Sequence, residues 1–239
     1  MRYRRQRVRF SATRLAPLAV VALACMQTAQ PTPQSVPAGI NDAFLDPALD
    51  VNQYVERFEG ESRAVYAERS AIVETLRVSP GDVVADIGAG TGFFTFLIAD
   101  AVGSGGRVQA VEVSPRFIDH LRGESRRRGE ENIEVIEGTQ RSVMLPAGQT
   151  DLAFICDVYH HFESPMESLS SLYSAIKPGG ELVVIEFHRV PGETPPWLLE
   201  HVRAGREVFQ AEIESAGFHF VEEITLPGLD DNYILRFVR

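Results

Sequence analysis

Apolar and polar positions change period repeatedly along this chain from about residue 80 onward. Short apolar runs typical of buried strands recur at 82–87, 107–112, 133–137, 151–156, 181–187, 218–225 and 232–238. Helical spacing fills most of the intervals, for example over 91–101, and such alternation predicts a parallel sheet. The last two runs are joined by residues 226–231 alone, too few for a helical crossover, so they should pair antiparallel. We therefore predict an α/β fold with a seven-stranded, mostly parallel sheet, an antiparallel last strand and helices on both faces.

Helical spacing is also present outside this alternation. Residues 52–76 place apolar side chains at helical intervals, and residues 198–215 predict one helix after a proline-rich loop at 191–197.

The first predicted strand ends in an unusual turn. Asp86 is followed by glycines at 88, 90 and 92, a spacing that differs from the G-x-G-x-x-G of dinucleotide sites. Glycine lets a backbone approach a ligand closely. A carboxylate in the turn would repel a pyrophosphate but suits a cofactor that carries an ammonium and a sulfonium group. The alternative is a glycine-rich turn without a ligand.

A second acid supports the ligand interpretation. Glu112 ends the next predicted strand, twenty positions after Gly92, where a carboxylate can accept hydrogen bonds from both ribose hydroxyls. An acid in such a place would otherwise be a solvated residue.

At this point the chain resembles the class I S-adenosylmethionine-dependent methyltransferases, over roughly residues 52–239. The resemblance rests on residues 84–92, 111–113, 151–162 and 172–186, the last with Lys177-Pro178-Gly179-Gly180. It implies a Rossmann-like sheet and S-adenosylmethionine as cofactor. The residues it implies for binding this donor are Asp86, Gly88, Ala89, Gly90, Gly92, Glu112 and, at the methionine end, Asp157.

One position departs from the family pattern. Many relatives have an Asp directly after the glycine that follows the third strand, and it binds the adenine amino group. Here Gly138 is followed by Thr139 and Gln140, so we expect a hydroxyl and an amide to replace that acid.

Acid–base chemistry, where the reaction needs it, is expected from His160 and His161, which follow the fourth predicted strand. Methyl transfer is an in-line displacement, so alignment alone can also suffice. In related enzymes such a histidine pair is also found as a structural element, and this alternative stays open.

The acceptor side is less well marked in the sequence. Tyr66, His188 and Trp197 are the candidate substrate contacts. Arg63 and Arg69 are expected to be solvated, with a contact over the cofactor as the alternative. Surface exposure is also expected of His201, Arg203 and Arg206, with the alternative that His201 turns inward together with Arg203 or Glu200. No pair of His, Cys or carboxylate residues has a convincing metal-ligand spacing, so no metal is predicted.

Length, composition and net charge limit the number of domains and the kinds of partner that we expect. The chain has 239 residues, 44% of them hydrophobic, which is enough for one core, and we expect one catalytic domain over residues 51–239. Its formal net charge is −10, although all six arginines of the first 25 residues lie in a segment without acids. The rest of the chain is thus more acidic still, which disfavours nucleic acid as partner or acceptor.

The N-terminus resembles an export signal. Arginines up to Arg14 precede an apolar stretch at 15–24, and residues 22–24 form an A-x-A cleavage site. Residues 22–25 also resemble a lipoprotein box, so a lipidated Cys25 would tether the protein to a membrane. We predict a signal over 1–25, a proline-rich linker over 26–50, and a periplasmic or membrane-anchored protein; a cytoplasmic tail is the alternative.

The sequence thus predicts methyl transfer from S-adenosylmethionine to a small or lipophilic acceptor at O, N or C. The alternative is a catalytically inactive S-adenosylmethionine-binding protein that acts as a sensor or membrane-tethered partner. A dinucleotide oxidoreductase is disfavoured by the glycine spacing. Acceptor identity and oligomeric state are not predicted.

Overall fold

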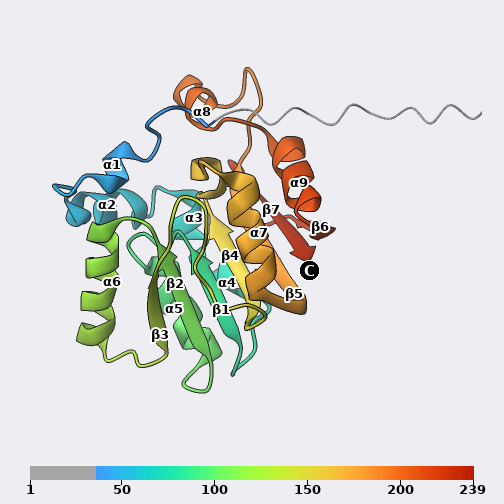
Figure 1. The fold of residues 1–239 in the computed structure, drawn as a ribbon. Helices are drawn as coiled ribbons and strands as arrows, with labels where there is room; N and C mark the ends of the chain where they lie inside the picture. Colours follow the sequence, from blue (N-terminus) through green and yellow to red (C-terminus); the bar gives the residue numbers. More distant parts are fainter. Residues whose placement is uncertain (1–35) are drawn as a thin grey trace, which may run out of the picture. The chain divides into compact units, whose positions relative to one another are not determined.

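A computed structural model describes residues 36–239 of the chain, and the predicted export signal lies outside them. The described residues build one seven-stranded sheet with helices on both faces (Figure 1). The strands are β1 (Val83–Ile87), β2 (Arg107–Glu112), β3 (Ile133–Glu137), β4 (Thr150–Cys156), β5 (Ile176–Phe187), β6 (His219–Ile224) and β7 (Asn232–Val238). The helices are α1 (Asp42–Leu45), α2 (Val51–Phe58), α3 (Ala64–Ala67), α4 (Arg69–Leu76), α5 (Phe93–Val102), α6 (Pro115–Arg128), the 3₁₀ helix η1 (Tyr159–His161), α7 (Pro165–Ala175), α8 (Pro196–His201) and α9 (Arg206–Ser215).

The strand order is β3-β2-β1-β4-β5-β7-β6. Strands β1 to β5 pair in parallel, whereas β7 runs antiparallel to both β5 and β6. The predicted fold class is therefore confirmed, including the antiparallel last strand.

Alternate residues of the strands build two cores, because successive side chains of a strand point to opposite faces. Val84 and Phe154 pack with Ile98 of α5 and with α4 on one face. Ala85 and Ile155 pack on the other face, in a core that also contains residues of α7 and α9. The strands in between are buried on both faces, as expected for a parallel sheet covered by helices.

The parallel strands all end on one side of the sheet, and α1, α2 and α8 lie beyond these carboxyl ends (Figure 1). Ligands of open α/β sheets bind outside the carboxyl ends of the strands. The fold thus brings together the turns that follow β1, β2, β3 and β4.

The helix predicted over 198–215 is in fact two helices. Residues 202–205 separate α8 from α9, and Val202 has an extended backbone. Arg203 turns into the core there, where it pairs with Glu212 and is 4% exposed. The prediction that Arg203 is a surface residue was therefore wrong, because apolar spacing does not reveal a buried ion pair.

The linker prediction is revised for the residues that the structure describes. Residues 42–45 form α1, and the side chain of Asn41 is buried against the turn after β4. This segment is part of the folded domain.

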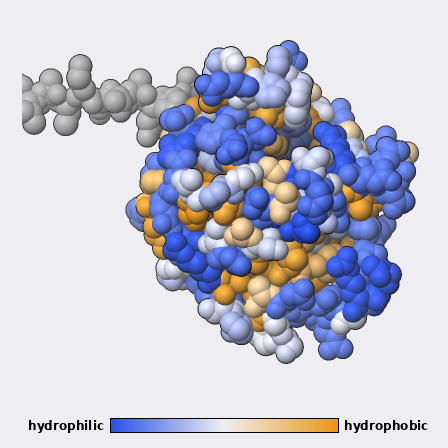
Figure 2. Space-filling view, turned by 180° about the vertical axis from the view of Figure 1, so that it is seen from behind, coloured by the Kyte–Doolittle hydropathy of each residue, from blue (hydrophilic) through white to orange (hydrophobic). Residues whose placement is uncertain are grey.

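Viewed from the side opposite to Figure 1, the surface is mostly hydrophilic with apolar residues scattered between polar ones (Figure 2). Within residues 36–239, no helix combines the length and the apolar character needed to cross a bilayer.

Candidate active site

A cavity of about 660 Å³ lies at the carboxyl edge of the sheet. This volume is typical of small-molecule sites. The predicted site residues that line it are Asp86, Gly88, Ala89, Gly90, Glu112, Thr139, Gln140, Asp157, His160, His161 and Trp197. The structure therefore brings together most of the residues singled out in the sequence.

The three glycines after β1 have different tasks. All have positive φ, at 73° for Gly88, 54° for Gly90 and 87° for Gly92. A Cβ on Gly88 would lie 2.5 Å from Val158, and one on Gly92 would lie 2.6 Å from Leu121. A Cβ on Gly90 would meet no atom closer than 3.9 Å. Gly88 and Gly92 are thus required for packing, whereas Gly90 leaves its backbone open to the cavity.

Asp86 and Glu112, from β1 and β2, line the cavity next to this turn. The Thr95 hydroxyl donates to Asp86 Oδ2 at 2.5 Å, and burial raises the pKa of Asp86 to about 6 despite that hydrogen bond. Glu112 accepts hydrogen bonds from the N–H groups of Gly90, Val113 and Ser114. Burial raises the pKa of Glu112 as well, and the backbone N–H groups oppose this rise. Glu112 is thus compensated by three backbone donors, whereas Asp86 has the Thr95 hydroxyl, and its buried carboxylate favours a cationic ligand.

Two polar atoms beside the cavity are buried without a hydrogen-bond partner among the described residues. They are Thr91 Oγ1, in the glycine turn, and Gln140 Nε2, after β3. Buried polar groups are nearly always paired, so these two atoms indicate where a ligand would supply the partner. The Thr139 hydroxyl, in contrast, accepts the N–H groups of Arg141 and Ser142 within its own turn. Of the two residues predicted to contact adenine, Gln140 is therefore the better placed.

Asp157 connects the sheet to the segment before β1. Its backbone has φ 53°, and its carboxylate accepts hydrogen bonds from Arg63 Nη2 at 2.6 Å and from Asn232 Nδ2 at 2.7 Å. Burial nevertheless raises the pKa of Asp157 to about 6, although the Arg63 charge lowers it. Arg63 lines the cavity too, so the expectation that it is solvated was wrong. Only its distant acidic partner distinguishes it from a surface arginine.

The histidine pair of η1 is held by two different partners. His160 is 1% exposed, and its Nδ1 lies 2.9 Å from both carboxylate oxygens of Glu186. His161 Nδ1 lies 3.1 Å from Asn41 Oδ1. Burial, together with the neighbouring His160 and His201, lowers the pKa of His161 to about 2, so this ring is neutral at physiological pH.

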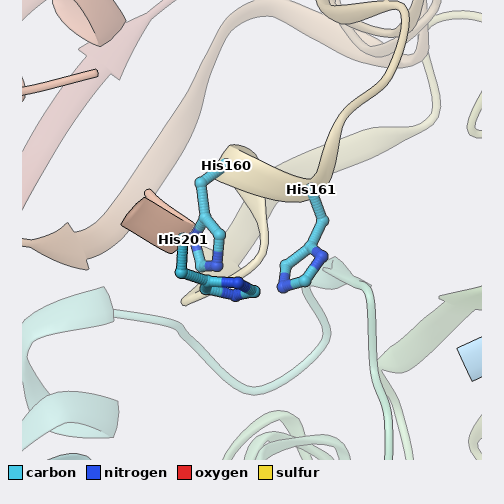
Figure 3. A group of neighbouring side chains, drawn as sticks. All are labelled: His160, His161 and His201. Atoms are coloured by element: carbon cyan, nitrogen blue, oxygen red, sulfur yellow. The ribbon is translucent and has the colours of Figure 1, made fainter. Parts of the chain in front are cut away.

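A third histidine joins the pair. The ring centre of His201, the last residue of α8, lies 5.0 Å from the ring centres of both His160 and His161 (Figure 3). His201 is half-buried, so the expectation that it is exposed was wrong and the alternative that it turns inward is the one observed. The fold brings these three side chains together across some forty residues, although spacing along the chain shows no metal-ligand pattern.

Buried contacts around α8 explain this approach. Arg203 makes two hydrogen bonds to the Glu212 carboxylate, which also accepts the Tyr159 hydroxyl at 2.8 Å. Arg189, after β5, donates to the carbonyls of Leu199 and Val202 at the end of α8. Tyr159 belongs to η1, so these contacts tie the helix of His201 to that of His160 and His161.

The candidate acceptor contacts have different outcomes. Trp197 lines the cavity, although it is 59% exposed. Tyr66 lies outside the lining and packs on Phe93 and Arg69, and His188 packs on Tyr233 instead. The structure thus does not place Tyr66 or His188 in the cavity lining, and their role as substrate contacts stays a prediction.

Aromatic residues that the sequence did not single out line the cavity instead. Phe44 from α1, with Tyr54 and Phe58 from α2, pack on one another and on Phe117. Phe44 lies 5.3 Å from the His161 ring, centre to centre. Phe44 and Asn41 fall in the segment predicted as a linker, where no local pattern marks them.

Comparison with known proteins agrees with this geometry. Residues 85–182 match a family model described as "Methyltransferase domain". The ubiquinone/menaquinone biosynthesis C-methyltransferase of Hydrogenovibrio crunogenus is 29% identical over 119 residues, 49% of this chain and 47% of the relative. The protein-L-isoaspartate O-methyltransferase of Methanococcus aeolicus is 26% identical over 154 residues, 64% of this chain and 66% of the relative.

Among solved structures, a SAM-dependent methyltransferase from Aquifex aeolicus superposes with a TM-score of 0.69 and 20% identity, covering 79% of this chain and 98% of its own. The chain spans about half the length of the curated relatives it matches. Residues 85–182 therefore resemble a methyltransferase domain, and the chain shares the fold of the SAM-dependent methyltransferase from Aquifex aeolicus.

Proposed function

We propose that this protein transfers a methyl group from S-adenosylmethionine to a small, lipophilic and preferably aromatic acceptor. The observation that carries the proposal is that one cavity is lined both by the glycine turn with Asp86 and Glu112 and by the histidine cluster with aromatic side chains. We assign the first set to the donor and the second to the acceptor, and call them the donor half and the acceptor half.

The donor half fits the proposed cofactor. Gly90 leaves room for a ligand to approach its backbone closely. The Thr91 hydroxyl and Gln140 Nε2 lack hydrogen-bond partners among the described residues. Asp86 would hold the cationic methionine end, Glu112 the ribose hydroxyls and Gln140 the adenine. The cofactor supplies a methyl group already activated by positive sulfur.

The acceptor half fits an apolar ring. Phe44, Tyr54 and Phe58 supply aromatic faces, and Trp197 stands at the rim. Offset stacking on such faces stabilises planar ligands. The relative named for quinone biosynthesis supports the same acceptor class. His160 and His161 would orient the acceptor or hold its proton.

Calorimetric titration with S-adenosylmethionine, S-adenosylhomocysteine and NAD in parallel tests the donor assignment. We expect both adenosyl compounds to bind and NAD not to bind. Transfer of labelled methyl from S-adenosylmethionine to a panel of phenols, hydroquinones and aliphatic alcohols then tests the acceptor class.

His161→Ala should lower turnover far more than donor affinity. Unchanged turnover in both His160→Ala and His161→Ala would leave alignment as the mechanism. Donor binding without transfer to any acceptor would contradict the proposed activity and favour an inactive binding protein.

A further inference from the structure

The three histidines of the cavity converge on one point. The rings of His160, His161 and His201 face one another (Figure 3), and one ring nitrogen from each lies within 4.8 Å of the others. Their ring centres are 4.3, 5.0 and 5.0 Å apart. Three imidazoles on a tetrahedral zinc ion, with Zn–N near 2.0–2.1 Å, have ring centres about 5 Å apart. The ring centres thus lie close to the separation that such an ion requires, and the ligand nitrogens, within 4.8 Å of one another, would have to approach to about 3.4 Å on binding.

The hydrogen-bond partners leave the required nitrogens of the pair free. Asn41 Nδ2 donates to Glu163 Oε1 at 2.8 Å and to the carbonyl of His161 at 3.0 Å, so Asn41 Oδ1 is the acceptor that faces His161. The proton of His161 therefore sits on Nδ1, and the lone pair on Nε2. His160 is held in the same way, because its Nδ1 donates to the Glu186 carboxylate. A carboxylate or carbonyl behind each ligand histidine is the usual arrangement of metal sites.

Charge favours a cation at this point. Glu186 is fully buried, and its other hydrogen bonds come from the backbone N–H groups of His160 and Phe187. Among the described residues no lysine or arginine forms an ion pair with Glu186, so a metal ion held by His160 would bring positive charge close to this carboxylate. Arg57 is the cationic neighbour of His201, but it is an exposed side chain and is screened by solvent.

We propose that His160, His161 and His201 bind one divalent transition-metal ion, of which zinc is the best match to the donor set. Three neutral nitrogens without a carboxylate exclude a magnesium or calcium site, since these ions require oxygen ligands. Three protein ligands leave a coordination position open, as in catalytic zinc sites. The cluster lies beside aromatic side chains of the cavity, with Phe44 5.3 Å from the His161 ring, so this position would be available to an oxygen atom of the acceptor.

Only this last role rests on the proposed methyl transfer, because metal binding is measured without donor or acceptor. Full-length protein without a histidine tag is treated with a chelator and titrated with ZnCl₂ by calorimetry, and with CoCl₂ by visible absorption spectroscopy. We expect one ion per chain and the d–d absorption of Co²⁺ with tetrahedral nitrogen ligands.

His201→Ala is the informative variant. His201 is half-buried at a helix end, so its loss leaves the fold intact, whereas zinc affinity should fall at least tenfold and the Co²⁺ absorption should disappear. His219→Ala, an exposed histidine at the start of β6, is the matched control and should bind as the wild type does. Removal of His161 in His161→Ala should weaken binding similarly.

Two results would overturn the metal site. One is folded wild-type protein that binds no stoichiometric Zn²⁺. The other is equal zinc affinity in wild type and His201→Ala, since the ion would then sit elsewhere. S-adenosylhomocysteine binding, measured on the same chelated samples, tells a failed metal site from a failed donor site.

Discussion

At the scale of single residues, burial disfavours the charged form of two acidic side chains in the cavity. Asp86 and Asp157 are buried, and burial raises the pKa of each to about 6. Neither has enough positive charge around it to compensate fully. Such residues are typical of functional sites, where a ligand supplies what the protein lacks.

Asp86→Asn should abolish donor binding, with at least a hundredfold loss of affinity, because the amide keeps the shape of the side chain but not its charge. In the wild type, donor affinity should weaken as the pH falls below about 6, where Asp86 becomes protonated. Calorimetry between pH 5 and 8 measures both effects. Donor affinity that is independent of pH would contradict a role for the Asp86 charge.

The same substitution should stabilise the free protein at neutral pH. The folded-state pKa of Asp86 lies above its ordinary value, so the folded protein binds more protons between about pH 4 and pH 6 and loses stability as the pH rises through that window. Asp86→Asn removes this loss. Thermal unfolding at pH 7.5 should therefore favour the variant, with a difference that shrinks toward pH 4.

Gly90→Val separates ligand contact from folding. Its φ of 54° makes a side chain strained, at about 1–2 kcal/mol, but no protein atom blocks the Cβ. We expect a folded protein that no longer binds S-adenosylhomocysteine. Gly129→Val is the matched control, since Gly129 has φ 73° in the left-handed region and open surroundings away from the cavity. Equal donor affinity in the two variants would place the donor elsewhere.

At the scale of elements, the segments before β1 complete the site. The Arg63 guanidinium, at the start of α3, holds Asp157 after β4, and its side chain is 24% exposed against 6% for that of Asp157. Arg63 also lies over the rings of Phe58 and Phe93. The helices over the cavity are thus anchored to the sheet through one ion pair.

Arg63→Met should destabilise the protein by about 3 kcal/mol, because it leaves a buried carboxylate without its charged partner. Urea unfolding measures the change. The matched control is Arg69→Met, which removes an exposed pair with Glu61 and should cost less than about 1 kcal/mol. Restored stability in Arg63→Met combined with Asp157→Asn would attribute the loss to the unpaired charge.

Residues 36–50 should be needed for function as well as for folding. A chain that begins at residue 36 is expected to keep full donor affinity and turnover. A chain that begins at residue 51 loses the Asn41 contact to His161 and the ring of Phe44, so its turnover should fall at least tenfold. Equal turnover of the two chains would assign this segment to a linker after all.

At the scale of the whole molecule, ligand binding should appear as stability. A ligand that binds only the folded state at a hundred times its dissociation constant adds about 2.7 kcal/mol. For a domain of this size, this corresponds to a rise in Tm of about 5–10 °C. We expect that rise with S-adenosylhomocysteine and none with NAD, and a rise with NAD instead would contradict the donor assignment.

Features with a local cause were predictable from the sequence. Short apolar runs predicted the seven strands, and the short connection at 226–231 predicted the antiparallel β7. Asp86 and the glycines at 88, 90 and 92 were found because a tight turn with positive φ leaves its mark in adjacent positions. Glu112 was found because it ends a strand at a regular distance from that turn.

The remaining features of the site depend on the tertiary structure, because they are contacts between residues far apart in the chain that no repeating pattern of the sequence connects. Asp157 meets Arg63 across 94 positions, and His161 meets Asn41 across 120. His201 joins the histidine pair because Arg203 turns inward to Glu212, and neither charge differs in the sequence from a solvated one. Burial and pairing of polar groups depend on which surfaces the fold brings together. The histidine cluster, and the packing of Asn41 and Phe44 over the cavity, therefore could not be predicted from the sequence.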